Sequence, residues 1–225
     1  MIPRHHLPDD VLMAHASGVS APAIEVLVSA HLVLCPDCRR QTAEYEAVGG
    51  AALSRQDPAP VDASVLDSIM DQLDTGMPPE RNPAPDTSSV EQDLLDGGLI
   101  LPRPILELVA QTAGRWKAVV PGLIHEIFLP LTHGEMPVRL IRMRGGFEVP
   151  PHTHDGTEIN LVLAGGYNDD EVEFERGDVQ FSDESVTHSL KIHKEAPCVL
   201  LVVNESPLVP VGAKSRLAQL FTGKM

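Results

Sequence analysis

The chain has 225 residues, 43% of them hydrophobic, and a formal net charge of −15. This length is sufficient for one large domain or two small ones. Binding to nucleic acid releases counterions through lysines and arginines, and these number only 17 against 32 acidic residues, so the composition argues against direct nucleic-acid binding. The acidic surface suits a basic protein partner, although the charge alone is explained more simply by solubility.

No run of about 18 apolar residues occurs, so we expect no membrane span. Residues 1–10 are polar and do not form a secretory signal, which favours a cytoplasmic location. The three cysteines are Cys35, Cys38 and Cys198. Two of them lie three residues apart, which in a cytosolic protein points to metal or redox chemistry and not to a structural disulfide. Cys198 lies in an apolar segment and is expected in the core.

Residues 1–75 read as helical. Helices are expected over residues 9–17, which Gly18 can stop, and over 22–34, where Pro22 suits a first turn. The second segment is apolar on nearly all sides and is expected in the middle of a small bundle. A third helix should start at the Cys35-Pro36 break and run to about residue 48, where two glycines end it.

A fourth helix is expected over residues 61–73, with one apolar stripe formed by Val61, Val65, Leu66, Ile69 and Leu73. This stripe can pack on the other three helices or on a partner, and core packing is slightly favoured. The expected N-terminal unit is therefore a small four-helix bundle.

Residues 76–93 are rich in proline and polar side chains, which is typical of a linker. The predicted division is a helical domain over 1–75, a linker over 76–99 and a second domain over 100–225. Beyond about residue 100 short apolar runs predict strands of an all-β sandwich or small barrel, at 124–129, 138–143, 158–164, 171–174, 178–181 and 198–203. The tail segment 215–221 could form a closing helix. The overall class is a multidomain α+β protein.

A first metal motif, HxxxCxxC, is formed by His31, Cys35 and Cys38. Zinc prefers thiolate and imidazole ligands, usually four in a tetrahedron, so a further ligand is required. His6 is the best candidate, and His5 and His15 are possible substitutes. Such a site would join three helices of a domain too small to be held firmly by its core. Two buried cysteines or a redox pair are the alternatives.

The stretches RHHLPDDVLMAHASG and AHLVLCPDCRR, together with this motif, resemble the zinc-binding anti-sigma domain in its ChrR branch. The resemblance implies that His6, His31, Cys35 and Cys38 bind zinc and that the helices clamp a group IV (extracytoplasmic-function) sigma factor. Some zinc anti-sigma factors use a spare N-terminal cysteine as a disulfide trigger. Residues 1–34 contain no cysteine, so that route is not open within this domain.

A second motif places His152, His154 and Glu158 in one short stretch, with His188 on a later segment. Alternate residues of a strand face the same side, so the first two imidazoles can share a site. Imidazoles and a carboxylate at the mouth of a barrel suit zinc, iron, manganese or a similar divalent ion.

This pattern resembles the cupin signature, and the glycines at 146 and 165 complete its first half. The second half departs from the family, because Asp183, Ser185 and Ile192 replace its usual proline, glycine and asparagine. The resemblance implies a C-terminal cupin barrel, or jelly roll, in which the four residues of the second motif bind a divalent metal, with zinc favoured. A cupin fold that uses no metal is the alternative.

The two resemblances together imply a cytoplasmic anti-sigma factor that binds and inhibits its sigma factor and releases it under oxidative stress such as singlet oxygen. Such a regulator is not an enzyme. The main alternative is a metal-dependent cupin enzyme, either a dioxygenase or an isomerase, because open metal positions could bind oxygen or substrate. That alternative leaves the N-terminal motif unexplained. A metal-storage protein would not need the linked helical bundle.

Overall fold

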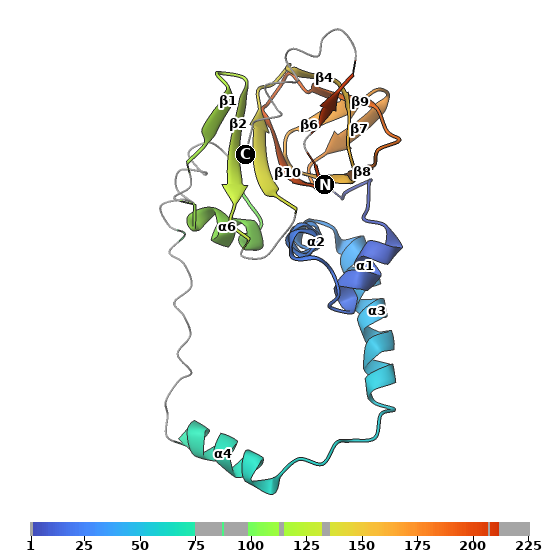
Figure 1. Ribbon diagram of the computed structural model, residues 1–225, viewed down its shortest axis with the longest axis vertical. Coiled ribbons are helices and arrows are strands. Elements are labelled where there is room, and N and C mark those ends of the chain that lie inside the picture. The colour runs from blue at the N-terminus through green and yellow to red at the C-terminus, as the bar shows by residue number, and fades with distance from the viewer. Residues whose placement is uncertain are drawn as a thin grey trace.

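The structure is a computed structural model that describes residues 2–74, 87, 99–112, 115–131, 136–206 and 208–211. Figure 1 shows a β-sandwich with a group of helices against one side and a further helix standing apart. Among the described residues, no helix combines the length and apolar character required to cross a bilayer. The expected class, a helical N-terminal region followed by a β domain, is confirmed.

Three helices form the first part of the chain, α1 (Asp9–Ala16), α2 (Pro22–Leu34) and α3 (Pro36–Leu53). The first two lie where they were predicted, and Gly18 follows α1 with a φ of 70°, a conformation that glycine adopts without strain. The third was predicted to end near residue 48, and that prediction is wrong. Each glycine in a helix costs only about 1 kcal/mol relative to alanine, and the following AAL segment favours helix, so α3 continues through Gly49 and Gly50.

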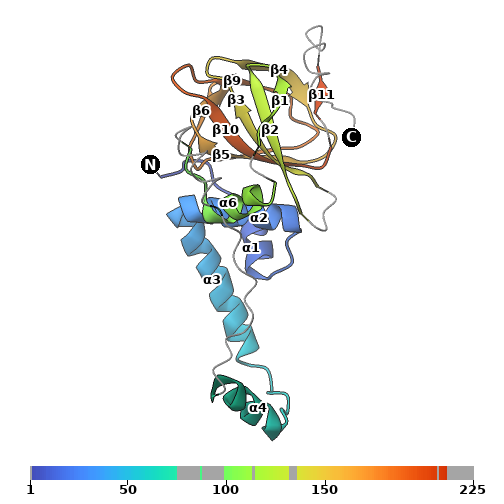
Figure 2. The same ribbon diagram turned by 90° about the vertical axis from the view of Figure 1, so that its left-hand side faces the viewer.

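The fourth helix, α4 (Ala63–Asp74), does not pack on the other three. Figures 1 and 2 show it well away from the sandwich and from α1 and α2. The preference for core packing of its apolar stripe is therefore wrong. Val65 is 44% exposed, Leu66 64% and Ile69 50%. An amphipathic pattern shows that one face favours burial, but it does not say against what.

A further helix, α6 (Arg103–Ala110), lies where only strands were expected. Pro104 stands in its first turn, where the missing N–H carries no cost, and Ile105 and Val109 are buried one turn apart. Strands begin immediately afterwards. Their bounds are β1 (Lys117–Val120), β2 (Ile124–Leu129), β3 (Val138–Met143), β4 (Glu148–Thr153), β5 (Glu158–Ala164), β6 (Gly166–Asp169), β7 (Val172–Glu175), β8 (Val179–Ser182), β9 (His188–Ile192), β10 (Cys198–Asn204) and β11 (Val209–Pro210).

The strands form two antiparallel sheets. One has the order β1-β2-β3-β10-β5-β8 and the other the order β11-β4-β9-β6-β7. One cluster of buried side chains, including Val162, Tyr167 and Leu200, fills the interior of the β domain. Cys198 belongs to this cluster, as expected.

The outer face of the six-stranded sheet is also buried, because helices cover it (Figure 2). Leu161 and Leu201 join a second core cluster with Leu27 of α2 and Ile105 of α6. A strand buried on both faces reads as a continuous apolar run, which explains the sequences of β5 and β10. Helix α2 contacts α1 and α3 as well as this sheet and α6, so its apolar residues are buried on more than one side.

Two predicted segments fall outside the described residues. The linker over 76–99 does so except for Thr87 and residue 99, and so does the tail helix over 215–221. The proposed division of the chain into 1–75, 76–99 and 100–225 therefore stays a prediction.

Candidate metal sites

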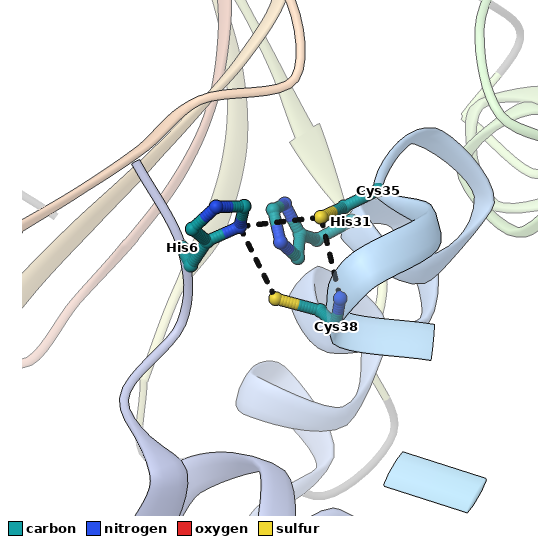
Figure 3. Close-up of side chains that lie close together, drawn as sticks. All are labelled: His6, His31, Cys35 and Cys38. Carbon is teal, nitrogen blue, oxygen red and sulfur yellow. Dashed lines mark hydrogen bonds between the residues drawn. The ribbon is translucent and has the colours of Figure 1, made fainter. Parts of the chain in front are cut away.

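The first candidate site gathers four side chains from three places in the chain. His6 precedes α1 on an extended segment, His31 lies in the last turn of α2, Cys35 is the residue between α2 and α3, and Cys38 lies in the first turn of α3. One ligand atom from each residue lies within 4.8 Å of the others. Figure 3 shows His6 facing both cysteines from the opposite side of the cluster.

The contacts within this cluster are short. The Nδ1 atom of His6 lies 3.3 Å from Sγ of Cys35 and 3.6 Å from Sγ of Cys38. The backbone N–H of Cys38 donates to Sγ of Cys35 at 3.4 Å, so the first sulfur also caps the start of α3. The tight turn between the two helices thus places both sulfurs on the same side.

His31 is completely buried and oriented by the β domain. Its Nδ1 lies 3.0 Å from the carbonyl oxygen of Gly177, and a carbonyl only accepts, so Nδ1 carries the proton. The other ring nitrogen, Nε2, is buried without a hydrogen-bond partner among the described residues. This tautomer leaves a lone pair on Nε2 for a metal, the arrangement typical of metal-binding histidines.

Burial shifts the pKa of two groups in this cluster. Burial lowers the pKa of His31 to about 4, so its imidazole is neutral at pH 7. Burial raises the pKa of Cys38 to about 12, with a smaller contribution from neighbouring Cys35. A divalent cation reverses the second effect, because a coordinated thiol loses its proton. Two thiols and two imidazoles therefore fit zinc, whose binding would release protons.

The other histidines considered as the fourth ligand make different contacts. The Nε2 atom of His5 lies 3.0 Å from the carbonyl of Glu173, and its ring packs on Phe174 at a centroid distance of 4.5 Å. The Nδ1 atom of His15 lies 2.8 Å from a carboxylate oxygen of Glu25. Of the three candidates, only His6 lies with the motif.

The second candidate site lies inside the β domain. His152 on β4, His154 just after it, Glu158 at the start of β5 and His188 at the start of β9 are all buried, again with ligand atoms within 4.8 Å of one another. The Nε2 atoms of His154 and His188 are 2.9 Å apart, and an oxygen of Glu158 lies 3.6 Å from the former. Three imidazoles and a carboxylate thus converge, a donor set that fits a divalent metal.

The electrostatics of this site favour neutral ligands before a cation binds. Burial lowers the pKa of His152, His154 and His188, in the last case to about 3. Burial also raises the pKa of Glu158, against the opposing effects of a hydrogen bond from Asn160 and the charges nearby. The Nδ1 atom of His154 is buried without a partner among the described residues. A bound cation would compensate these costs of burial.

Outer hydrogen bonds orient two of the imidazoles. Nδ1 of His152 donates to the carbonyl of Pro150 at 2.9 Å, and Nδ1 of His188 lies 3.2 Å from a carboxylate oxygen of Asp169. Gln180 donates to the same carboxylate and accepts from Tyr167. Sequence reasoning missed Asp169, because nothing in its local pattern shows that β6 lies beside β9.

The fold and the two sites define a protein in which a helical region with a thiol–imidazole cluster is attached to a cupin-like domain with an imidazole–carboxylate cluster. A family model described as the ChrR cupin-like domain matches residues 106–208. The chain is 31% identical over 207 residues to the anti-sigma-E factor ChrR of Cereibacter sphaeroides, and the alignment covers 91% of each protein. A chain in the crystal structure of Rhodobacter sphaeroides SigE in complex with the anti-sigma ChrR matches with a TM-score of 0.70 and 29% identity, covering 89% of this chain and 98% of that one.

The chain belongs to the ChrR family of anti-sigma factors. Its place in this family makes it a regulator and not one of the cupin enzymes. The β domain is accordingly called the cupin domain below.

Proposed function

We propose that this protein binds a group IV (extracytoplasmic-function) sigma factor, keeps it inactive, and thereby represses transcription from that factor's promoters. The site of action is the cytoplasm. The homologous ChrR was crystallised in complex with SigE, and the match extends over most of both chains. The contact is between proteins, because an acidic chain has little attraction for nucleic acid.

The observation that carries this proposal is the exposed apolar stripe of α4. Leu66 and Leu73 are 64% and 70% exposed, and no other described element covers the helix. A continuous apolar stripe left in water on an amphipathic helix is typical of a segment that docks on a partner. Its acidic residues, such as Asp67 and Asp71, lie away from the stripe and would favour a basic rim on the sigma factor.

In this proposal both clusters hold a metal. Zn²⁺ binds His6, His31, Cys35 and Cys38 and fixes the start of α3 against α2 and the N-terminal segment. A second divalent ion, with zinc favoured, binds His152, His154, Glu158 and His188 in the cupin domain. The donor atoms and their burial support both assignments.

Release of the sigma factor follows oxidative stress such as singlet oxygen. Thiolate and imidazole ligands are groups that such oxidants attack, and loss of a ligand would loosen the helices that hold the partner. A disulfide with a spare N-terminal cysteine is not an available trigger within residues 1–34. Cys198 is completely buried, and burial raises its pKa strongly, so it is a poor primary target.

The experiment compares two neighbouring substitutions in α4 of the full chain. Ile69→Asp places a charge on the exposed apolar stripe, whereas Ser68→Asp adds the same charge about 100° further around the helix, beside Asp67 and Asp71 on its polar face. Titration against a purified group IV sigma factor from the same genome should show affinity reduced about 10- to 100-fold by the first and little changed by the second. Because α4 packs on no other described element, neither change should alter the melting curve.

Equal affinity of both variants and the unchanged chain would show that α4 is not the docking helix. If the unchanged chain captures no group IV sigma factor at all, the proposed function itself is wrong.

A further inference from the structure

The N-terminal segment that carries His6 is held by the turn between β7 and β8 of the cupin domain. The buried carboxylate of Asp178 accepts the backbone N–H of Arg4 at 2.6 Å and that of His5 at 3.0 Å through one oxygen. Its other oxygen accepts the N–H of Glu175 at 2.8 Å. One side chain of the cupin domain therefore fixes the backbone N–H groups of the two residues immediately before the candidate ligand His6.

Other contacts reinforce this attachment. The N–H of Val179 donates to the carbonyl of His5 at 3.1 Å, in the manner of a strand pair. Pro3 is buried against Gly177, and a Cβ placed on that glycine would lie 2.7 Å from Cγ of the proline. Gly177 also has a φ of 97°, so the close approach and the backbone conformation both favour glycine at this position.

The same turn also orients the second nitrogen ligand. The carbonyl oxygen of Gly177 accepts a hydrogen bond from Nδ1–H of His31, and this contact joins residues 146 positions apart. The two sulfur ligands, in contrast, depend on the helices, because Cys35 and Cys38 are fixed by the junction of α2 and α3. The four-ligand cluster is thus divided, with its nitrogens positioned by the cupin domain and its sulfurs by the helical region.

We propose that Asp178 and the Gly177 carbonyl are outer-sphere positioning groups of the N-terminal metal site, so that this site is shared between the two domains. The inference rests on the metal binding proposed above and deepens it by assigning a route of regulation. A displacement of the β7–β8 turn moves His6 and reorients His31 while leaving the sulfurs in place. Damage to the cupin domain therefore lowers the metal affinity of the site that organises the sigma-binding helices.

The alternative is that Asp178 only attaches one domain to the other. A purely structural attachment would change the melting temperature but not the intrinsic affinity of the thiolate site for metal. Outer-sphere partners of metal ligands, in contrast, typically change metal affinity 10- to 100-fold when they are removed. Metal affinity therefore separates the two interpretations.

The test uses the full chain, stripped of metal, reduced and titrated with Co²⁺. Thiolate-to-cobalt charge-transfer absorption reports on the N-terminal site alone, because the second cluster contains no sulfur. In Asp178→Asn the amide cannot accept from Arg4, His5 and Glu175 together, so the midpoint of this absorption should shift to at least 10-fold higher Co²⁺ in competition with a chelator. The matched control is Asp183→Asn, which changes an exposed carboxylate in the next turn of the cupin domain. Among the described residues this carboxylate accepts hydrogen bonds from within its own turn, chiefly from Ser185.

Titration curves of Asp178→Asn and wild type that coincide, in a variant that retains its fold, would overturn the positioning role. If Asp178→Asn does not fold, Pro3→Asp decides the question, since it leaves the cupin sequence intact and repels the segment from Asp178. An unchanged affinity in Pro3→Asp would overturn the inference as well. Absence of the absorption in the unchanged chain would instead refute the metal site itself, and the inference with it.

Discussion

The two candidate metal sites differ in how the fold assembles them. The cupin cluster is buried throughout, and its four candidate ligands belong to one domain, on or next to the paired strands β4 and β9 and the strand β5 of the other sheet. The N-terminal cluster combines an exposed His6 on an extended segment with a completely buried His31 and two cysteines at a helix junction. The two sheets of the β-sandwich hold the cupin cluster in place, whereas the N-terminal cluster requires three separate segments to remain docked.

This difference indicates which site is the more easily disturbed. Local opening has its lowest free energy where few contacts tie a segment down, and the segment before α1 is held chiefly by the β7–β8 turn. This arrangement suits a regulator, because a small displacement of the β7–β8 turn in the cupin domain also displaces the segment that carries His6. Of the two clusters, we expect the cupin cluster to retain its metal longer and the N-terminal cluster to lose its metal first.

The largest expected effect comes from Cys35→Ser/Cys38→Ser. This variant should lose the N-terminal metal and keep the cupin metal, which mass spectrometry of metal content will show. In zinc-finger peptides a structural zinc contributes about 10–16 kcal/mol, so we expect α1 to α3 to lose their packing, measured as a fall in helical circular dichroism. Cys198→Ser is the control and should retain both metals. Two metals in the double variant would contradict the assignment.

A smaller effect concerns the pH dependence of the metal-free protein. His31 and His188 have pKa values lowered by burial to about 4 and about 3, whereas in the unfolded chain they take up protons near pH 6.5. The unfolded state therefore binds more protons below that pH. The free energy of unfolding should fall as the pH decreases from about 6.5 towards 4, by up to about 1.4 kcal/mol per pH unit for each group.

Urea denaturation between pH 7 and pH 4 measures this dependence. His188→Gln should flatten the curve, because it removes one of the two buried imidazoles. A stability that does not change over this range would show that these imidazoles are not held neutral by burial.

The smallest effect is expected from Arg4→Ala. The guanidinium of Arg4 forms exposed ion pairs with Glu173 and Glu175, at 3.0 and 3.1 Å, and such pairs contribute little. The contact that matters in our account is the backbone N–H of the same residue to Asp178. Cobalt affinity in Arg4→Ala should therefore change less than about threefold, in the titration used for Asp178→Asn. A loss of cobalt affinity as large as that in Asp178→Asn would show that the ion pairs of Arg4, and not its backbone N–H, position the N-terminal segment.

The sequence predicts the elements whose burial leaves a strong periodic signal. The bounds of α2, β2, β3 and β5 agree with the structure, because each is apolar enough to be read without knowledge of its neighbours. Strand β4 contains two prolines, and β6 is only a short GYND segment, so neither shows a recognisable strand pattern. The predicted end of α3 is wrong because the free-energy cost of two glycines in a helix is too small to stop it.

The proposed ligand residues can be predicted from the sequence, because metal chemistry restricts residue type and spacing. Their supporting groups cannot be. Asp169 and Asp178 look like ordinary turn aspartates, and only the packing of β6 on β9, or of the N-terminal segment on the β7–β8 turn, gives them a role. The position of α4 could not be predicted from the sequence either, because an apolar stripe is compatible with burial in a core and with docking on a partner.

We propose that the chain holds two metals in chemically different sites. X-ray absorption at the zinc edge of the zinc-loaded full chain, together with its zinc content, tests this most directly. We expect two zinc ions per chain and an average of about one sulfur ligand per zinc, because two sulfurs lie in one cluster and none in the other. A single zinc, or two zinc ions without sulfur ligands, would show that the chain does not hold these two sites.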